Sequence, residues 1–174
     1  IENTIIDKNN LLINNNIKDL ADITSLGTPT PGGGSISALA GAYGSALGSM
    51  VANLSFQKKD LDHFNLNYVS IGENCQKYKD KMLALIDSDT DAYNKVIEAI
   101  RLPKKSDADK KIRLKEIELA TIYAADIPME ILEISLKSLK LIHRLVDIAN
   151  PASITDLGVS LYMLYASAKG ASMN

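Results

Sequence analysis

The sequence contains no tryptophan, two phenylalanines and a single cysteine, Cys75. One cysteine excludes an internal disulfide framework and suits a reducing compartment, so a cytoplasmic protein is predicted. Because aromatic residues make up 5% of the chain, the apolar 46% is largely aliphatic and alanine-rich. Such a composition favours helices over strands.

Strong charge of either sign is also absent, because the formal net charge is −2 and the lysines are scattered. No basic field for nucleic acid is present, so no nucleic-acid partner is predicted. The first residues lack the basic start and long apolar core of a signal peptide. Their many asparagines predict a poorly ordered N-terminal segment at residues 1–15, followed by one helical domain at 16–174.

No segment shows the alternation of a strand, and apolar residues recur at helical steps of three or four. The sequence therefore predicts an all-α fold, a single helical bundle of about five to six helices. Pro128 lacks a backbone N–H, which predicts a kink or break there. Ser106 and Asp109 form a capping-box pattern, whereas His63 and His143 are isolated and expected at the surface. The expected helices span 16–26, 35–58 with Ser35 as N-cap, 60–100, 106–126 and 129–149. A last helix, capped by Ser153 or Thr155, is expected to run to Tyr165.

The stretch "GTPTPGGGSISALAGAYGSALGSMVANLS" combines three glycines with 19 uncharged residues after them. A membrane span needs about 20 predominantly apolar residues, but serines and glycines dilute this segment, so no membrane partner is predicted. A P-loop requires a lysine after the glycines, where Ser-Ile-Ser stands. A dinucleotide-binding loop requires a glycine at position 37, where this sequence has Ser37. Both phosphate-binding loops are therefore excluded.

A glycine-rich turn before a helix can still bind a ligand. Glycine lets a ligand approach the backbone, and the helix start presents free N–H groups to an anionic or carbonyl-bearing molecule. The alternative is a central bundle helix that follows a flexible turn without any ligand. Farther along, small residues let a neighbouring helix come close. The candidate binding residues are Pro31, Gly32, Gly33, Gly34 and Ser35, and the small residues are Gly41, Gly44, Ser45, Gly48 and Ser49.

The run "IDSDTDAYNKVIEAIRLPK" is the densest in acidic residues. Its spacing imitates a calcium loop, but Ala92 replaces the required glycine and the run lies within a helical pattern. No cysteine or histidine motif for zinc is present either, so no metal is predicted. On a helix Asp87 and Asp91 share one face and Asp89 lies opposite, so at least one faces the interior. An inward aspartate can relay protons, and the alternative is a solvated acidic face.

Four segments together resemble the cyclodeaminase domain of formiminotransferase-cyclodeaminase and its single-domain cyclohydrolase relatives. They are "TPTPGGGSISALAGAYGSALGSMVANLS", "LIDSDTDAYNKVIEAIRLPK", "IPMEILE" and "NPASITDLGVSLYMLYASAKGA". The resemblance covers nearly all of residues 16 to 173. It implies an all-helical fold, a homodimer or larger assembly, and folate one-carbon chemistry with no metal and no cofactor beyond the tetrahydrofolate substrate.

The resemblance places the catalytic aspartate in the Asp-x-Asp motif, matched here by Asp87 and Asp89, with Asp89 preferred. Because folate carries a glutamate tail, Arg101 and Lys104 are expected to bind its carboxylates. The alternative is that both cations only complement the dipole at a helix end. Asp126 is not expected to be catalytic. The relatives continue after the last helix, so part of that helix or of a pocket wall is expected beyond Asn174.

The function predicted first is formiminotetrahydrofolate cyclodeaminase, which converts 5-formiminotetrahydrofolate to 5,10-methenyltetrahydrofolate and ammonia. The second is methenyltetrahydrofolate cyclohydrolase, which gives 10-formyltetrahydrofolate. The third, from another class, is a helical binding or scaffold protein that kept the fold and lost the chemistry. One carboxyl group can serve either reaction as a proton relay, so the sequence leaves both open.

Overall fold

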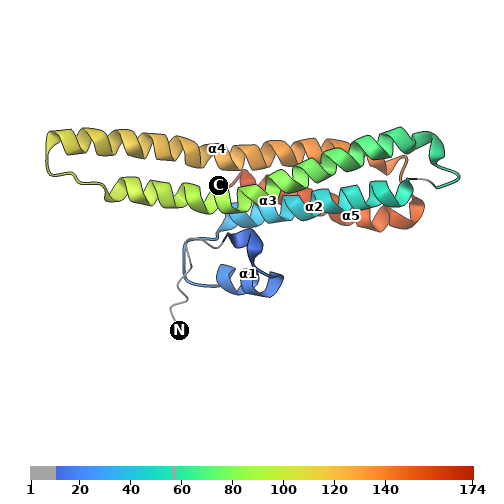
Figure 1. Cartoon of the computed structure of the whole chain (residues 1–174), viewed down its shortest axis with the longest axis horizontal. Helices are drawn as coiled ribbons and strands as arrows, with labels where there is room; N and C mark the ends of the chain where they lie inside the picture. Colours follow the sequence, from blue (N-terminus) through green and yellow to red (C-terminus); the bar gives the residue numbers. More distant parts are fainter. Residues whose placement is uncertain (1–10, 57) are drawn as a thin grey trace.

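The computed structural model describes residues 11–56 and 58–174, and their regular structure is entirely helical (Figure 1). The all-α prediction is confirmed, with five α-helices and three short 3-10 helices among these residues. In chain order they are η1 Leu12–Asn14, α1 Ile17–Thr24, α2 Gly33–Ser55, η2 Asp62–Phe64, α3 Asn65–Arg101, α4 Asp107–Val146, η3 Pro151–Ser153 and α5 Ile154–Ala171.

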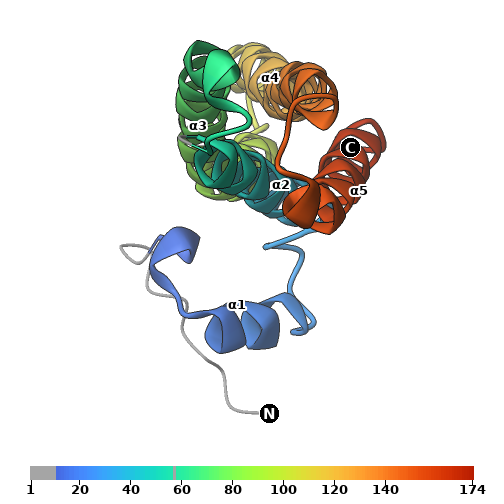
Figure 2. The same ribbon diagram turned by 90° about the vertical axis from the view of Figure 1, so that its right-hand side faces the viewer.

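Helices α2 to α5 form the bundle, and α1 lies apart from it beneath α2 (Figures 1 and 2). Helices α3 and α4 have 37 and 40 residues, whereas α2 and α5 have 23 and 18. The longer pair therefore continues past its neighbours as a two-helix arm, visible at the left of Figure 1. Between residues 11 and 174, leaving aside 57, we find no helix with both the length and the apolar character needed for a membrane crossing.

The bundle closes around α2 because its inward face carries almost no side-chain bulk. A Cβ atom added to Gly48 would lie 2.2 Å from Ile142 Cδ1, and one added to Gly44 would lie 2.7 Å from Leu164 Cγ. Buried serines satisfy one another across the contacts, as between Ser45 and Ser138 at 3.0 Å. The predicted close approach of neighbouring helices to α2 is thus confirmed.

The two histidines lie at the surface as the sequence predicted, and the single cysteine lies in the core. Cys75 is fully buried, and burial raises the pKa of its thiol to about 12. A thiol with that pKa stays protonated at neutral pH and is a poor nucleophile. His63 and His143 are exposed. Cys75 is therefore a core residue and the two histidines are surface residues, and none of the three is a buried reactive group.

The predicted helix boundaries need two corrections at the start and end of the bundle. Ser35 is not the N-cap of α2, because Gly32 holds that position and Ser35 lies in the first turn. The reason is that Asp89, from another helix, supplies the oxygen that a capping side chain would give. The last helix continues to Ala171 rather than ending at Tyr165, and Ser153, one of the two predicted caps, holds its N-cap position.

Of the kink or break predicted at Pro128, the break is wrong, because α4 runs through this residue as one helix. An interior proline costs about 3 kcal/mol through its lost hydrogen bond and its ring clash. Burying an aliphatic side chain contributes about 1.5–3 kcal/mol, and Ile127, Ile131 and Ile134 around the proline are all buried. Packing therefore outweighs the local cost. At the start of α4 the predicted capping box between Ser106 and Asp109 is present.

Candidate functional site

The first turn of α2 and the middle of α3 meet at Ser35 and Asp89. The Ser35 backbone N–H donates to Asp89 Oδ2 at 2.8 Å, and its hydroxyl lies 2.9 Å from the same oxygen. The hydroxyl also lies 3.0 Å from the carbonyl oxygen of Ile86, and Ser35 is completely buried. One carboxylate oxygen of Asp89 is thus held in place by a helix start, where free N–H groups favour negative charge.

Gly34 allows the Asp89 carboxylate to sit this close to α2. A Cβ atom at Gly34 would lie 2.0 Å from Asp89 Oδ1 and 2.5 Å from its Cγ. No side chain fits there, so the third glycine of the motif is required by a contact between two helices. The sequence motif and the acidic run, 54 residues apart, are parts of one site.

The two aspartates of the Asp-x-Asp motif have different surroundings. Asp89 is half-buried, and its Oδ1, the oxygen that lies against Gly34, accepts no hydrogen bond from a described residue. Asp87 accepts the backbone N–H of Leu12 at Oδ1, while its Oδ2 is buried without a partner among the described residues. Asp91 is exposed. As predicted, the motif does not point wholly to solvent.

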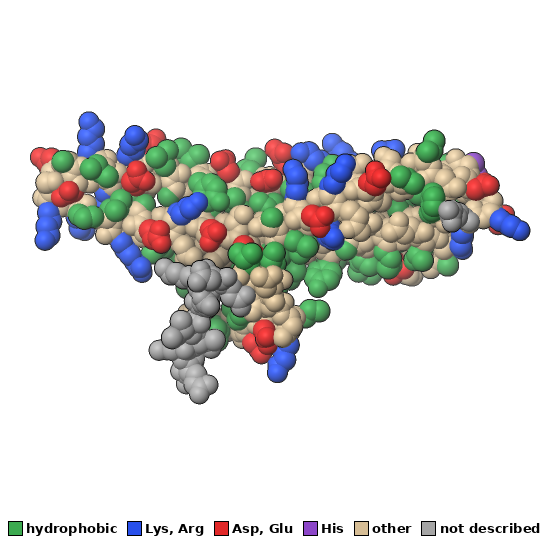
Figure 3. Space-filling view, in the orientation of Figure 1, with side chains coloured by type: hydrophobic (Ala, Val, Ile, Leu, Met, Phe, Trp, Pro, Cys, Tyr) green, Lys and Arg blue, Asp and Glu red, His purple; other side chains and the backbone are tan. Residues whose placement is uncertain are grey.

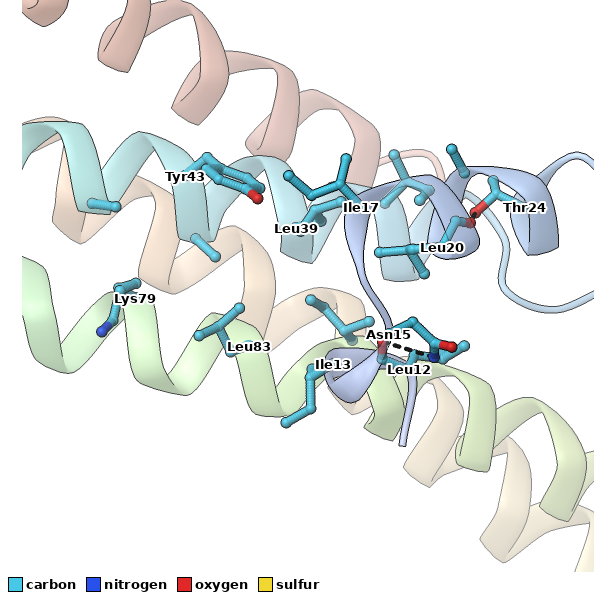
Figure 4. Close-up of a pocket in the computed structure, with 15 residues that line it drawn as sticks. Leu12, Ile13, Asn15, Ile17, Leu20, Thr24, Leu39, Tyr43, Lys79 and Leu83 are labelled. Atoms are coloured by element: carbon cyan, nitrogen blue, oxygen red, sulfur yellow. Dashed lines mark hydrogen bonds between the residues drawn. The ribbon is translucent and has the colours of Figure 1, made fainter. Parts of the chain in front are cut away.

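An apolar cavity of about 580 Å³ lies between α1 and the bundle (Figure 4), and its lining includes Ile36 and Ile86 but neither Ser35 nor Asp89. Ile17 and Leu20 of α1 lie on one side of it, and Leu39 and Tyr43 of α2 line it as well. Lys79 of α3 is the one cation among its lining residues, and its ammonium pairs with Asp80 at 2.9 Å. The volume is in the range of small-molecule sites, which are mostly apolar with few polar groups.

The structure brings some of the predicted binding residues together and leaves others apart. Pro31, Gly32 and Gly33 precede Ser35 at the start of α2, and Gly33 is exposed next to the Asn174 side chain. Arg101, the last residue of α3, is about 18 Å along the helix from Asp89 at 1.5 Å per residue. Lys104 follows it in the connection to α4. Both cations are exposed at the end of the arm.

Sequence reasoning missed two contributors to this region. Leu12, inside the segment expected to be poorly ordered, is buried and donates to Asp87. Residues 1–10 of that segment lie outside the described residues. Thr90, whose hydroxyl lies 3.4 Å from that of Ser35, carried no motif signal. Its place next to Asp89 on the helix was the only available hint.

The described residues of this region do not form a ligand set for a metal ion. Within residues 11–56 and 58–174, no three side chains of histidine, cysteine, aspartate or glutamate are grouped so that they could hold a metal ion. Asp87 and Asp89 point toward different elements, η1 and α2. The chemistry that this site can perform with its own groups is proton transfer by a carboxylate, assisted by helix N–H groups.

Comparison with known proteins gives one consistent result. The model of the family described as formiminotransferase-cyclodeaminase matches residues 16–174. Methenyltetrahydrofolate cyclohydrolase of Methylorubrum extorquens is 30% identical over 161 residues, 92% of this chain and 77% of that protein. Formimidoyltransferase-cyclodeaminase of Gallus gallus is 29% identical over 145 residues, 83% of this chain and 27% of that longer protein.

A solved structure shows the same fold. The crystal structure of formiminotetrahydrofolate cyclodeaminase from Thermotoga maritima superposes with a TM-score of 0.82 over 92% of this chain and 76% of that chain, at 24% identity. The family model covers residues 16–174, which include both the Pro-Gly-Gly-Gly-Ser turn and the Asp-x-Asp motif. In the structure these two motifs are in contact through Ser35 and Asp89. This chain belongs to the formiminotransferase-cyclodeaminase family.

Proposed function

We propose that this protein is a folate one-carbon enzyme, with formiminotetrahydrofolate cyclodeaminase activity as the first candidate. The observation that carries the proposal is the Asp89 carboxylate, which has one oxygen held by Ser35 and the other free of hydrogen bonds from the described residues. We also propose that it acts in the cytoplasm as a homodimer. Its substrate is a tetrahydrofolate derivative.

In the proposed reaction, N10 of 5-formiminotetrahydrofolate attacks the formimino carbon, and a C–N bond forms. The bond from that carbon to the departing nitrogen then breaks, giving ammonia and the 5,10-methenyl cation. The formimino nitrogen enters the reaction protonated, so N10 must lose one proton and the departing nitrogen must gain one to leave as ammonia, a transfer that Asp89 Oδ1 can relay. As a carboxylate, Asp89 also stabilises the cationic product through its charge.

Asp87 is the second candidate for this relay. Its Oδ2 is a buried oxygen without a partner among the described residues, next to the end of the apolar cavity formed with η1. Its Oδ1 is bound by Leu12, so access to Asp87 requires displacement of η1. Asp89 needs no such displacement. We therefore assign the relay to Asp89 first.

The turn before α2 is the proposed contact for the folate ring system. Gly32 and Gly33 expose backbone, and the first N–H groups of α2 can donate to a carbonyl oxygen of the ligand. Arg101 and Lys104 are the proposed contacts for the glutamate carboxylates, because a folate lying along α3 extends toward the arm. Arg101→Gln should then raise KM and leave kcat unchanged, whereas Lys115→Gln, exposed on α4, should change neither.

Methenyltetrahydrofolate cyclohydrolase is the second candidate function, because the Methylorubrum relative with that name is matched over 77% of its length. Here water attacks the carbon of the same methenyl cation, and the same carboxylate acts as base for a water proton. The bond from that carbon to N5 then breaks, N5 gains one of the two water protons, and the other is released to solvent. The product is 10-formyltetrahydrofolate. Both candidate reactions thus use one site. The cyclodeaminase forms the methenyl cation, and the cyclohydrolase consumes it.

One assay distinguishes the candidates. The protein is incubated separately with 5-formiminotetrahydrofolate and with 5,10-methenyltetrahydrofolate, and the absorbance of the methenyl group is followed. Accelerated appearance of this absorbance from the first substrate supports the cyclodeaminase, and accelerated loss with the second supports the cyclohydrolase. No effect on either would contradict the enzyme proposal and favour a helical binding protein.

A further inference from the structure

The Asp89 carboxylate has a buried hydroxyl group behind it. Elsewhere along α3 and α4, acidic side chains stand on the surface among lysines and arginines (Figure 3). Ser35 is completely buried, and its hydroxyl oxygen lies 2.9 Å from Asp89 Oδ2 and 3.0 Å from the carbonyl oxygen of Ile86. A hydroxyl with no exposed surface acts on a bound molecule only through the group it contacts, which here is the Asp89 carboxylate.

The Ser35 hydroxyl has one proton and two acceptors within reach. A serine hydroxyl donates one hydrogen bond and can accept others. The Asp89 carboxylate and the Ile86 carbonyl only accept, so the proton of Ser35 serves one of them at a time. Hydrogen bonds to a charged group are about twice as strong as those between neutral groups. An ionised Asp89 therefore takes this proton, and a neutral Asp89 releases it to the carbonyl.

A second hydroxyl, that of Thr90, adjoins the first. Its oxygen lies 3.4 Å from the Ser35 hydroxyl oxygen, and either group can be the donor. The carbonyl four residues before Thr90 is that of Ile86, and a threonine in a helix commonly donates to the carbonyl at this spacing. The two hydroxyls thus share one carbonyl. When Ser35 donates to Asp89, Thr90 can donate to Ser35, and hydrogen bonds in such a chain strengthen one another.

The backbone of α2 decides which oxygen of Asp89 takes up a proton. The Ser35 N–H points at Oδ2 from the first turn of the helix, at a distance of 2.8 Å. Because this donor is fixed, Oδ2 keeps accepting a hydrogen bond, and a proton is taken up at Oδ1 instead. Oδ1 lies against Gly34, where a Cβ atom would be 2.0 Å away. The proton therefore arrives at and leaves from one defined oxygen.

We propose that Ser35 and Thr90 are positioning residues for the Asp89 proton relay, as a pair of hydroxyl groups that reorient with its charge. While Asp89 is a carboxylate, Thr90 donates to Ser35 and Ser35 donates to Oδ2. When Oδ1 takes the proton from N10, the Ser35 hydroxyl turns to the Ile86 carbonyl, and it turns back when that proton passes to the departing nitrogen. Neither hydroxyl loses its own proton. The inference rests on the proposed function, because it concerns the residue that the proposed reaction uses.

Steady-state kinetics on the folate substrate that the unmodified chain turns over is the first test. Ser35→Ala should lower kcat by about 10- to 100-fold with KM unchanged, because a hydrogen bond to a charged group is lost and the buried hydroxyl does not contact substrate. Thr90→Val should lower kcat about threefold, because its contact is longer and neutral. Thr90→Ser keeps the hydroxyl and should retain turnover. Ser88→Ala is the matched control and should change nothing, since that hydroxyl donates to the Ala84 carbonyl of its own helix at 3.1 Å.

The double variant Ser35→Ala/Thr90→Val distinguishes a chain of hydroxyls from two independent contributions. Because Thr90 acts through Ser35, the double variant should have the kcat of Ser35→Ala alone, whereas independent effects would multiply. Circular dichroism and thermal unfolding verify that each variant is folded. The inference is overturned by a folded Ser35→Ala with unchanged kcat, or by a double variant whose kcat is lower than that of Ser35→Ala by the full effect of Thr90→Val.

A second measurement does not depend on turnover. In amide NMR spectra the signal of the Ser35 N–H reports its hydrogen bond to Asp89. Thr90→Val should move this signal, and Ser88→Ala, equally adjacent to Asp89 in the chain, should leave it in place. If the unmodified chain turns over neither folate, the enzyme proposal fails, and a moved Ser35 signal still supports the hydroxyl pair as the support of Asp89. An unmoved signal overturns the pair whether or not the chain is an enzyme.

Discussion

The two faces of α2 are built from opposite kinds of residue. Toward the bundle, glycine and serine leave so little bulk that Ile142 and Leu164 reach the helix backbone. Away from it, Tyr43, Met50 and Leu54 present large side chains that the described residues leave exposed. Hydrophobicity alone does not separate the faces, because the whole helix is apolar and uncharged. Residue size separates them, because small residues face the bundle and large ones face away from it.

The first turn of α2 makes a third kind of contact, in which the missing side chain leaves room for a carboxylate. Gly34 has no Cβ because the Asp89 carboxylate occupies that position. Farther along, Gly44 and Gly48 have no Cβ because the side chains of Leu164 and Ile142 occupy those positions. The inward face therefore changes from a polar contact at its start to an apolar one, and substitutions along it should change from affecting turnover to affecting stability.

The largest effect is expected for Asp89→Asn. The amide keeps the size of the carboxylate but cannot relay a proton, so turnover should fall by about 100-fold or more with little change in KM. Steady-state kinetics on whichever folate substrate proves active gives both constants. Asp91→Asn, at an exposed position two residues away, is the matched control and should retain turnover. If Asp87→Asn abolishes turnover while Asp89→Asn does not, the relay belongs to Asp87.

This site could be predicted from the sequence in its parts but not in its assembly. The glycine turn and the aspartates were recognisable as motifs, because each has a local chemical requirement. The Ser35–Asp89 contact joins residues 54 apart, and no local pattern encodes it. The same limitation explains the wrong N-cap at Ser35 and the wrong break at Pro128, where contacts with other helices replace or outweigh local rules. The helical class was predictable because the period recurs in every segment.

Gly34→Ala should have the next largest effect. Its Cβ would overlap Asp89 Oδ1 at 2.0 Å, so the carboxylate must move and the Ser35 hydrogen bonds are lost. Forced side-chain movement of this kind costs about 1–3 kcal/mol, and turnover should fall with it. Thermal unfolding provides the comparison with Gly33→Ala, whose Cβ would meet only the Asn174 side chain at 3.5 Å. Equal melting temperatures for both variants would show that Asp89 is not held where we describe it.

Gly44→Ala and Gly158→Ala form a pair with opposite expected signs. At Gly44 the new Cβ would lie 2.7 Å from Leu164 Cγ and 3.1 Å from the Leu164 backbone nitrogen, so α5 must shift, at about 1–3 kcal/mol. At Gly158 it would meet nothing within 4 Å, so alanine should stabilise α5 by about 0.5–1 kcal/mol. Urea unfolding measures both free energies. A stabilising Gly44→Ala would contradict the close packing of α2 on α5.

The smallest effect is expected on the outward face, for Leu54→Gln. Leu54 is 49% exposed, so removing its apolar end should change the free energy of unfolding of the isolated chain by less than about 0.5 kcal/mol. The measurement is urea unfolding at the lowest usable protein concentration, where a dimer is dissociated. A large loss at low concentration would mean that Leu54 is buried within its own chain, and the two faces of α2 would then no longer differ.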